Sequence, residues 1–280
     1  MKKFLTRVAT GIVYMAVIFI ALFTTKELFF GIFGIIMMLT INELHKNLAI
    51  KNITVNKPLT DLFALCLYCL PVFKAYDLHI GTLLVLLAIL WLTLFSVELR
   101  NEGDNPFHRI AFSFLSIAYI AVPFTLLAYT STMQQSVFQS NCAAINSNMI
   151  LVFLLFLFTW SNDSFAFLWG SLFGKHHLAP KISPKKTVEG FLGGLISTIL
   201  LAFAIQFIPI LVSERYYLII ILSIIVVAFS TVGDLVESKL KRYIGVKDSG
   251  KLLPGHGGML DRFDSLIFSI PAFFAYLQIF

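Results

Sequence analysis

Apolar stretches alternate with short polar segments along the whole chain. Nine of these stretches approach the length of about 20 residues that a helix needs to cross about 30 Å of hydrocarbon. They occupy residues 8–25, 28–45, 61–77, 80–97, 109–129, 149–170, 190–211, 217–235 and 264–280. The pattern predicts an all-α fold, a polytopic integral membrane helical bundle with about nine transmembrane helices, eight to ten being compatible with the sequence.

The composition supports this membrane class. The chain is 58% hydrophobic and only 13% charged, and its mean hydropathy is +0.87. The sequence contains no soluble domain, no sustained repeat and neither of the nucleotide-binding patterns GxxxxGKS/T and GxGxxG. A lone CxxC, Cys66 and Cys69, lies in an apolar stretch, which favours packing over a zinc or redox site.

The basic residues predict the orientation in the membrane. If the N-terminus is cytoplasmic, the outer connections hold only three basic residues, Lys26, Lys74 and Arg215, and the connection 131–148 has no charge. This asymmetry follows the positive-inside rule. The net charge of +6 is therefore mainly an orientation signal, and it does not indicate nucleic-acid binding. The first apolar stretch is longer than a signal peptide requires, so we interpret it as the first span.

Four consecutive hydrogen-bonding side chains interrupt the sixth predicted span at 161–164. Polar groups in hydrocarbon are costly and therefore need a partner or a purpose. Asp163 could hydrogen-bond between helices, as polar residues do in membrane bundles. Alternatively, it contacts a ligand or a metal in a polar cavity.

A basic segment, 174–194, precedes the seventh predicted span. Its lysines could simply anchor the loop at lipid headgroups. However, Ser183-Pro184 is typical of a helix start. We expect that start to place three side chains where a phosphate binds favourably, those of Lys185, Lys186 and Thr187. Close helix packing is expected at the glycines that follow, Gly190, Gly193 and Gly194.

The third polar region runs from Gly233-Asp234, which closes the eighth predicted span, to Asp264. On a helix, one face would carry Asp234, Glu237, Ser238, Lys241 and Arg242. A functionless surface helix could also show that stripe. The segment 255–258, Gly-His-Gly-Gly, is able to bring backbone amides close to an anion. Carboxylates beside cations and a glycine loop suit phosphate chemistry through Mg²⁺, which prefers oxygen ligands.

Residues 238–264 read SKLKRYIGVKDSGKLLPGHGGMLDRFD, which resembles the signature of the phosphatidate cytidylyltransferases, or CDP-diacylglycerol synthases. The resemblance extends to NDSFAF at 162–167 and ISPKKTVEG at 182–190, and covers roughly the last 120 residues. It implies a multi-pass enzyme of the inner (cytoplasmic) membrane that converts CTP and phosphatidic acid into CDP-diacylglycerol and pyrophosphate. The implied cofactor is Mg²⁺, with a second monovalent cation such as K⁺, and the implied assembly is a homodimer in the lipid bilayer.

The resemblance also implies roles for individual residues. It assigns catalytic roles to Asp234, Asp261, Lys241, Arg242 and His256. It assigns substrate binding to Ser183, Lys185, Lys186, Thr187, Ser238, Lys247, Gly257, Gly258 and Arg262. The implied metal carboxylates are Asp234, Asp261, Asp264, Asp248 and Asp163.

These roles divide the chain into N-terminal transmembrane helices, 1–145, and a catalytic region, 146–280, within one integrated membrane domain. Its cytoplasmic loops are expected at 174–190 and 236–263. Ser164, Phe167 and Val188 depart from the residues common in the family, which leaves details of the pocket open. Two other functions stay compatible with the sequence: a lipid kinase or cytidylyltransferase acting on another lipid, and an ion transporter.

Overall fold

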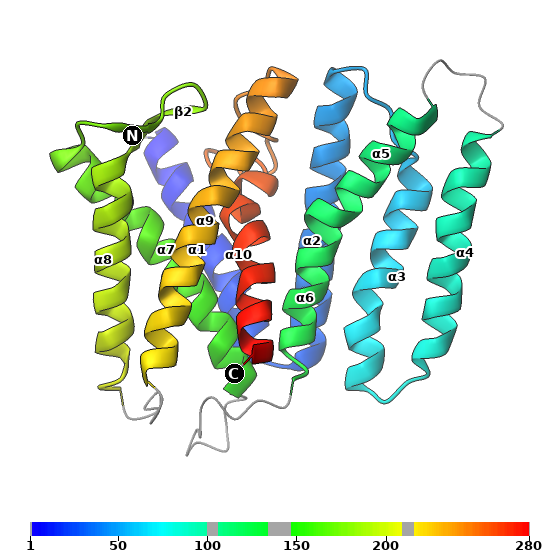
Figure 1. Ribbon diagram of the computed structural model, residues 1–280, viewed down its shortest axis with the longest axis horizontal. Coiled ribbons are helices and arrows are strands. Elements are labelled where there is room, and N and C mark those ends of the chain that lie inside the picture. The colour runs from blue at the N-terminus through cyan, green and yellow to red at the C-terminus, as the bar shows by residue number, and fades with distance from the viewer. Residues whose placement is uncertain (1, 100–105, 134–146, 209–215, 280) are drawn as a thin grey trace. The chain divides into compact units, whose positions relative to one another are not determined.

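The computed structural model describes residues 2–99, 106–133, 147–208 and 216–279, and most of them are helical (Figure 1). The predicted connection 131–148 lies largely outside the described residues. Within them, seven helices are long and apolar enough to cross a membrane. They are Lys26–Ile50, Lys57–Ala75, Ile80–Glu98, Phe107–Thr130, Asn148–Phe173, Val188–Ile205 and Tyr216–Ile244. The prediction of a helical membrane protein is confirmed.

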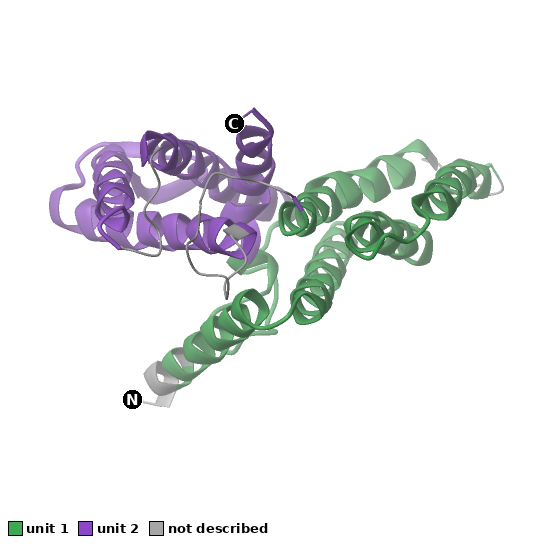
Figure 2. Cartoon of the chain, turned by 90° about the horizontal axis from the view of Figure 1, so that it is seen from below, with its two compact units in different colours: residues 1–132, 244–262 green, residues 133–243, 263–280 purple. Residues whose placement is uncertain are grey.

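The chain divides into two compact units, coloured separately in Figure 2. Unit 1 comprises residues 1–132 and 244–262, and unit 2 comprises residues 133–243 and 263–280. The loop after α9 therefore groups with the N-terminal helices.

Unit 1 contains the helices α1 (Lys2–Phe23), α2 (Lys26–Ile50), α3 (Lys57–Ala75), α4 (Ile80–Glu98), α5 (Pro106–Ser116) and α6 (Val122–Thr130). Thr25 caps α2 by accepting a hydrogen bond from the Leu28 amide at 3.3 Å. A π-helical turn, η1 (Ile117–Ala121), joins α5 to α6 just before Pro123. Because proline has no N–H to donate, the wider turn lets one long helix continue past it.

Unit 2 contains α7 (Ser147–Phe173), the strands β1 (His177–Ala179) and β2 (Ser183–Thr187), α8 (Val188–Ile205), most of α9 (Tyr216–Ile244) and most of α10 (Leu260–Ile279). The glycines of α8 let α7 pack closely against it. A Cβ on Gly194 would lie 2.7 Å from Asn162 Oδ1, and a Cβ on Gly190 would lie 2.8 Å from the Ala166 carbonyl oxygen. The predicted close helix packing at these glycines is confirmed.

One local prediction was wrong. The chain does not begin a helix at Ser183-Pro184, because Ser183–Thr187 pairs antiparallel with β1, and α8 begins only at Val188. Strand pairing satisfies backbone groups there that a helix would otherwise satisfy. Beyond the eighth predicted span, which closes at Gly233-Asp234, α9 continues as a helix to Ile244, as the predicted stripe from Asp234 to Arg242 requires.

Candidate active site

The hairpin in unit 2 holds its lysines in front of α8. Thr187, not Ser183, caps this helix, and its hydroxyl accepts a hydrogen bond from the Gly190 amide at 3.1 Å. Glu189 links the residues just before β1 to the same helix end, because its carboxylate accepts hydrogen bonds from the Lys175 and His176 amides. The basic segment is thus a fixed structure in which Lys185 and Lys186 directly precede the cap.

A cavity of about 370 Å³ lies between the hairpin and the helices of unit 2. Lys185, Lys186 and Thr187 line it, and so do two carboxylates, Asp163 and Asp234. Further walls are apolar, among them Phe167, Leu178 and Phe191. The cavity therefore offers cations and acids beside an apolar wall, which suits a ligand with both a phosphate group and an apolar part. The structure brings these five predicted polar residues together.

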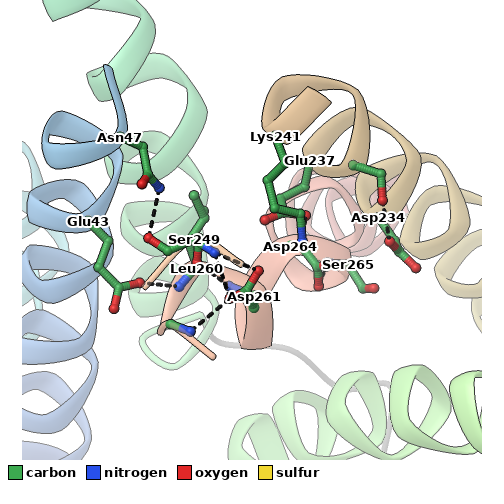
Figure 3. Close-up of polar contacts among 12 residues, drawn as sticks. Glu43, Asn47, Asp234, Glu237, Lys241, Ser249, Leu260, Asp261, Asp264 and Ser265 are labelled. Carbon is green, nitrogen blue, oxygen red and sulfur yellow. Dashed lines mark hydrogen bonds and ion pairs between the residues drawn. The ribbon is translucent and has the colours of Figure 1, made fainter. Parts of the chain in front are cut away.

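The predicted stripe on α9 is present. Ser238 donates a hydrogen bond to Asp234 Oδ1 at 3.3 Å, and Lys241 pairs with Glu237 at 2.5 Å (Figure 3). Both pairs are four residues apart, as expected for neighbours on a helix face. Asp234 also forms an ion pair with Lys186 of the hairpin. Arg242, which belongs to the same predicted stripe, is exposed.

Four carboxylates of unit 2 form what we call the acidic cluster: Asp163, Asp234, Glu237 and Asp264. Asp264 lies within electrostatic range of the other three. Like charges at such range repel, and the repulsion is relieved by nearby cations or by protonation of a member. Lys186 and Lys241 supply two of these cations.

The carboxylate oxygens of the acidic cluster are the type of ligand that a divalent ion such as Mg²⁺ binds. Mg²⁺ takes oxygen ligands, commonly one or two protein carboxylates completed by substrate phosphates. Within the described residues, no group of three or more His, Cys, Asp or Glu side chains is placed to hold a metal ion by itself.

In unit 1, a segment that we call the Asp261 loop (residues 244–262) turns around one carboxylate. Asp261 Oδ2 accepts hydrogen bonds from the amides of Ser249 at 2.9 Å and Gly258 at 2.7 Å (Figure 3). Gly257, with φ of +84°, leaves room for this carboxylate, which a Cβ there would overlap. The glycine segment does bring backbone amides to an anion, and that anion is Asp261 itself.

The other predicted residues of the Asp261 loop are less enclosed. Lys247, Asp248 and Arg262 are exposed. The ring of His256 is half-buried, and its Nδ1 lies 2.8 Å from the hydroxyl of Thr10 on α1. The Thr10 hydroxyl also donates to the Pro254 carbonyl at 3.1 Å, so α1 helps to hold this part of the loop.

Sequence reasoning missed three polar residues in the contacts of these segments: Glu43, Asn47 and Glu189. Glu43 accepts a hydrogen bond from the Leu260 amide, and Asn47 donates one to the Ser249 carbonyl. A signal for Glu43 was present, because a carboxylate inside an apolar helix needs a partner. Its partner is a backbone amide 217 residues away in sequence, which no local pattern reveals.

Comparison with known proteins identifies the family of this chain. The sequence matches the model of the Cytidylyltransferase family over residues 5–280. A phosphatidate cytidylyltransferase of Staphylococcus saprophyticus is 38% identical over 195 residues, which cover 70% of this chain and 68% of the relative. A phosphatidate cytidylyltransferase of Staphylococcus aureus (strain COL) is 32% identical over 266 residues, 95% of either chain. Since the match spans almost the whole chain, including both units, this protein belongs to the cytidylyltransferase family.

Proposed function

We propose that this enzyme transfers CMP from CTP to phosphatidic acid, giving CDP-diacylglycerol and pyrophosphate for phospholipid biosynthesis. The relatives that align along most of the chain bear the name of this activity. The structural observation that carries the proposal is the cavity of unit 2, where two lysines and two carboxylates meet an apolar wall. A nucleotide triphosphate needs the cations, and a diacyl lipid needs apolar surroundings.

The reaction requires no nucleophile from the protein. The phosphatidate monoester oxygen, anionic near neutral pH, attacks the α-phosphorus of CTP. The new P–O bond forms as the bond from the α-phosphorus to the bridging oxygen breaks, and the electron pair leaves with pyrophosphate. The protein has to orient both phosphates and offset the charge on their oxygens, which is how phosphoryl transfer is commonly catalysed.

Lysines of unit 2 supply the positive charge that offsets the charge on the phosphate oxygens. Lys185 and Lys186 line the cavity, and Lys186 pairs with Asp234. An incoming phosphate competes for that ammonium group, because a phosphate offers more negative charge than one carboxylate. Thr187 and Ser183 set the position of both lysines by fixing the two ends of β2. Lys241 and Arg242 extend the basic surface along α9.

Asp163, Asp234 and Asp264 are the carboxylates of unit 2 that would hold Mg²⁺. When bound, Mg²⁺ would neutralise phosphate charge and polarise the phosphoryl group under attack. Lys186, the ion-pair partner of Asp234, would offer its ammonium group to a substrate phosphate. Asp261 and Asp248 belong to the implied metal set through the family resemblance, as does a second, monovalent cation such as K⁺.

The arrangement in the membrane is also part of the proposal. We propose nine spans, with α1 and α10 added to the seven apolar helices, and an orientation in which the N-terminus, the hairpin and the Asp261 loop face the cytoplasm, where CTP is available. The bacterial relatives favour the inner membrane. The homodimer is supported by the family resemblance alone.

The decisive experiment supplies purified protein in detergent with α-labelled CTP and phosphatidic acid, with and without Mg²⁺. We expect labelled CDP-diacylglycerol and equimolar pyrophosphate, both dependent on Mg²⁺. A lipid product that gains a single phosphate, with release of CDP, would instead identify a CTP-dependent lipid kinase. Ion flux in sealed vesicles without any CTP turnover would identify a transporter.

A further inference from the structure

Helix α2 directs two buried polar side chains at the Asp261 loop. Glu43 is only 7% exposed and Asn47 only 6%, and they lie one helical turn apart. A carboxylate in a membrane helix costs about 2.5–3.5 kcal/mol on insertion scales, so an unused one would not be expected. The reaction proposed above gives neither residue a role.

The contacts of both side chains are specific. Glu43 Oε2 accepts a hydrogen bond from the Leu260 amide at 2.9 Å, and Asn47 Nδ2 donates to the Ser249 carbonyl at 2.8 Å (Figure 3). Leu260 is the first residue of α10, so its amide has no acceptor within the helix. A negative charge at a helix N-terminus also interacts favourably with the helix dipole. Glu43 thus caps α10 from another helix.

The Asp261 loop is shaped around this carboxylate. A Cβ on Gly250 or on Gly258 would overlap the carboxylate of Glu43. Only glycine at both positions lets the loop backbone approach so closely. The fit on both sides restricts where the Glu43 carboxylate, and hence the Leu260 amide, can lie.

The residues that α2 holds are the same residues that hold Asp261. Ser249 accepts from Asn47 through its carbonyl, while its amide donates to Asp261. The Ser249 hydroxyl accepts in turn from the Asp261 amide at 3.2 Å. Leu260 precedes Asp261 directly. A shift of the α2 contacts would therefore move the backbone on both sides of the Asp261 carboxylate.

We propose that Glu43, assisted by Asn47, is a positioning residue that sets the direction of the Asp261 carboxylate for the reaction. This rests on the proposed function, in which Asp261 is one of the metal carboxylates. Glu43 acts through the geometry of an acceptor oxygen, not through contact with substrate. Its loss is expected to lower kcat while leaving the KM for CTP nearly unchanged.

Two variants of Glu43 distinguish geometry from charge. Glu43→Gln keeps an acceptor oxygen at the same reach without the charge, whereas Glu43→Asp keeps the charge but withdraws it by one methylene. We expect Glu43→Asp to lower kcat about 10- to 100-fold, the usual effect of losing an outer-shell partner. Glu43→Gln should retain most of kcat. The matched control is Glu27→Gln, an exposed carboxylate on the same helix.

Hydrogen exchange provides a readout independent of activity. In Glu43→Asp, the peptide covering residues 249–261 should exchange faster than in the wild type, while peptides from α3 and α4 stay unchanged. Asn47→Ala should show the same pattern more weakly, and it serves as the second variant if Glu43→Asp does not fold.

The proposal fails if Glu43→Gln loses as much kcat as Glu43→Asp, because the charge itself would then be required. It also fails if both variants keep wild-type kcat per folded molecule, or if exchange of residues 249–261 does not change. Absence of pyrophosphate release from the wild type would overturn the proposed reaction instead, and the exchange data would still report on the α2 contacts.

Discussion

Two of the carboxylates predicted to bind a metal ion have different kinds of partner in the two units. In unit 1, Asp261 accepts hydrogen bonds from the Ser249 and Gly258 amides. In unit 2, Asp234 pairs with the flexible side chain of Lys186. Backbone amides are fixed by the loop and cannot leave, whereas a lysine can exchange one anion for another. The first arrangement suits a permanent structure, and the second suits a site whose charges rearrange when substrate binds.

The largest expected effect is the fall in turnover when Asp234 is replaced. Asp234→Asn removes the exchangeable carboxylate. We expect turnover to fall about 10²- to 10³-fold, which is the usual loss when one strong electrostatic contact to the transition state is removed. The melting temperature should change little, because the side chain is only half-buried. Lys239→Gln, an exposed position on the same helix, is the control. Turnover near that of the wild type would remove Asp234 from the site.

Asp261→Asn should differ by damaging stability as well as activity. Because Oδ2 accepts from both amides, the asparagine oxygen can take its place, and the NH₂ group then lies at Oδ1, where it faces the Ser249 amide donor 3.2 Å away. An unsatisfied buried donor costs about 1–3 kcal/mol, so the melting temperature should fall. Thermal unfolding in detergent, measured beside Asp234→Asn, tests this contrast directly. Equal melting temperatures for both variants would contradict the distinction between fixed and exchangeable partners.

Substitution of glycine by alanine compares how tightly the helices pack within each unit. Gly194→Ala places a methyl group against Asn162 in unit 2, and overpacking of this kind costs about 1–3 kcal/mol. In unit 1, a Cβ on Gly31 meets nothing within 4 Å. Gly31→Ala should therefore be neutral or slightly stabilising, since alanine favours a helix by about 1 kcal/mol over glycine. Unfolding in a denaturing detergent series would measure both, and a stable Gly194→Ala would show that α7 and α8 pack less tightly.

Lys186→Ala tests whether the hairpin binds phosphate or only sets topology. We expect the KM for CTP or for phosphatidic acid to rise about tenfold, corresponding to about 1.4 kcal/mol. Lys181→Ala in the same hairpin removes an exposed lysine that does not line the cavity, and its KM values should match those of the wild type. Reduced membrane insertion of both variants with normal KM values would favour the topological role.

The smallest expected effect concerns the cap of α8. Thr187→Val keeps the shape of the side chain but removes the oxygen that accepts from Gly190, which should cost about 1 kcal/mol. Thr187→Ser should restore the cap and most of the melting temperature. If valine and serine behave alike in thermal unfolding, the hydroxyl does not contribute as a cap.

Much of this architecture was predictable from local features. Runs of apolar residues specified the helices because hydrocarbon leaves a backbone few other ways to satisfy its hydrogen bonds. The spacing of Asp234, Ser238, Glu237 and Lys241 predicted the stripe on α9, since helix geometry alone makes residues four apart neighbours. The start of α8 was predicted at the wrong residue, because Ser183-Pro184 also suits an edge strand and pairing with β1 decided between them.

By itself, the sequence determined that this is a helical membrane protein of the cytidylyltransferase type, because span length and motif spacing are properties of the chain alone. Only the tertiary structure decided which partner each carboxylate has. Asp261 turns to the amides of its own loop, Asp234 pairs with a lysine of the hairpin, and Glu43 caps a helix more than 200 residues away. Hydrogen bonds and ion pairs act over a few ångströms, and folding alone brings such distant residues within that range.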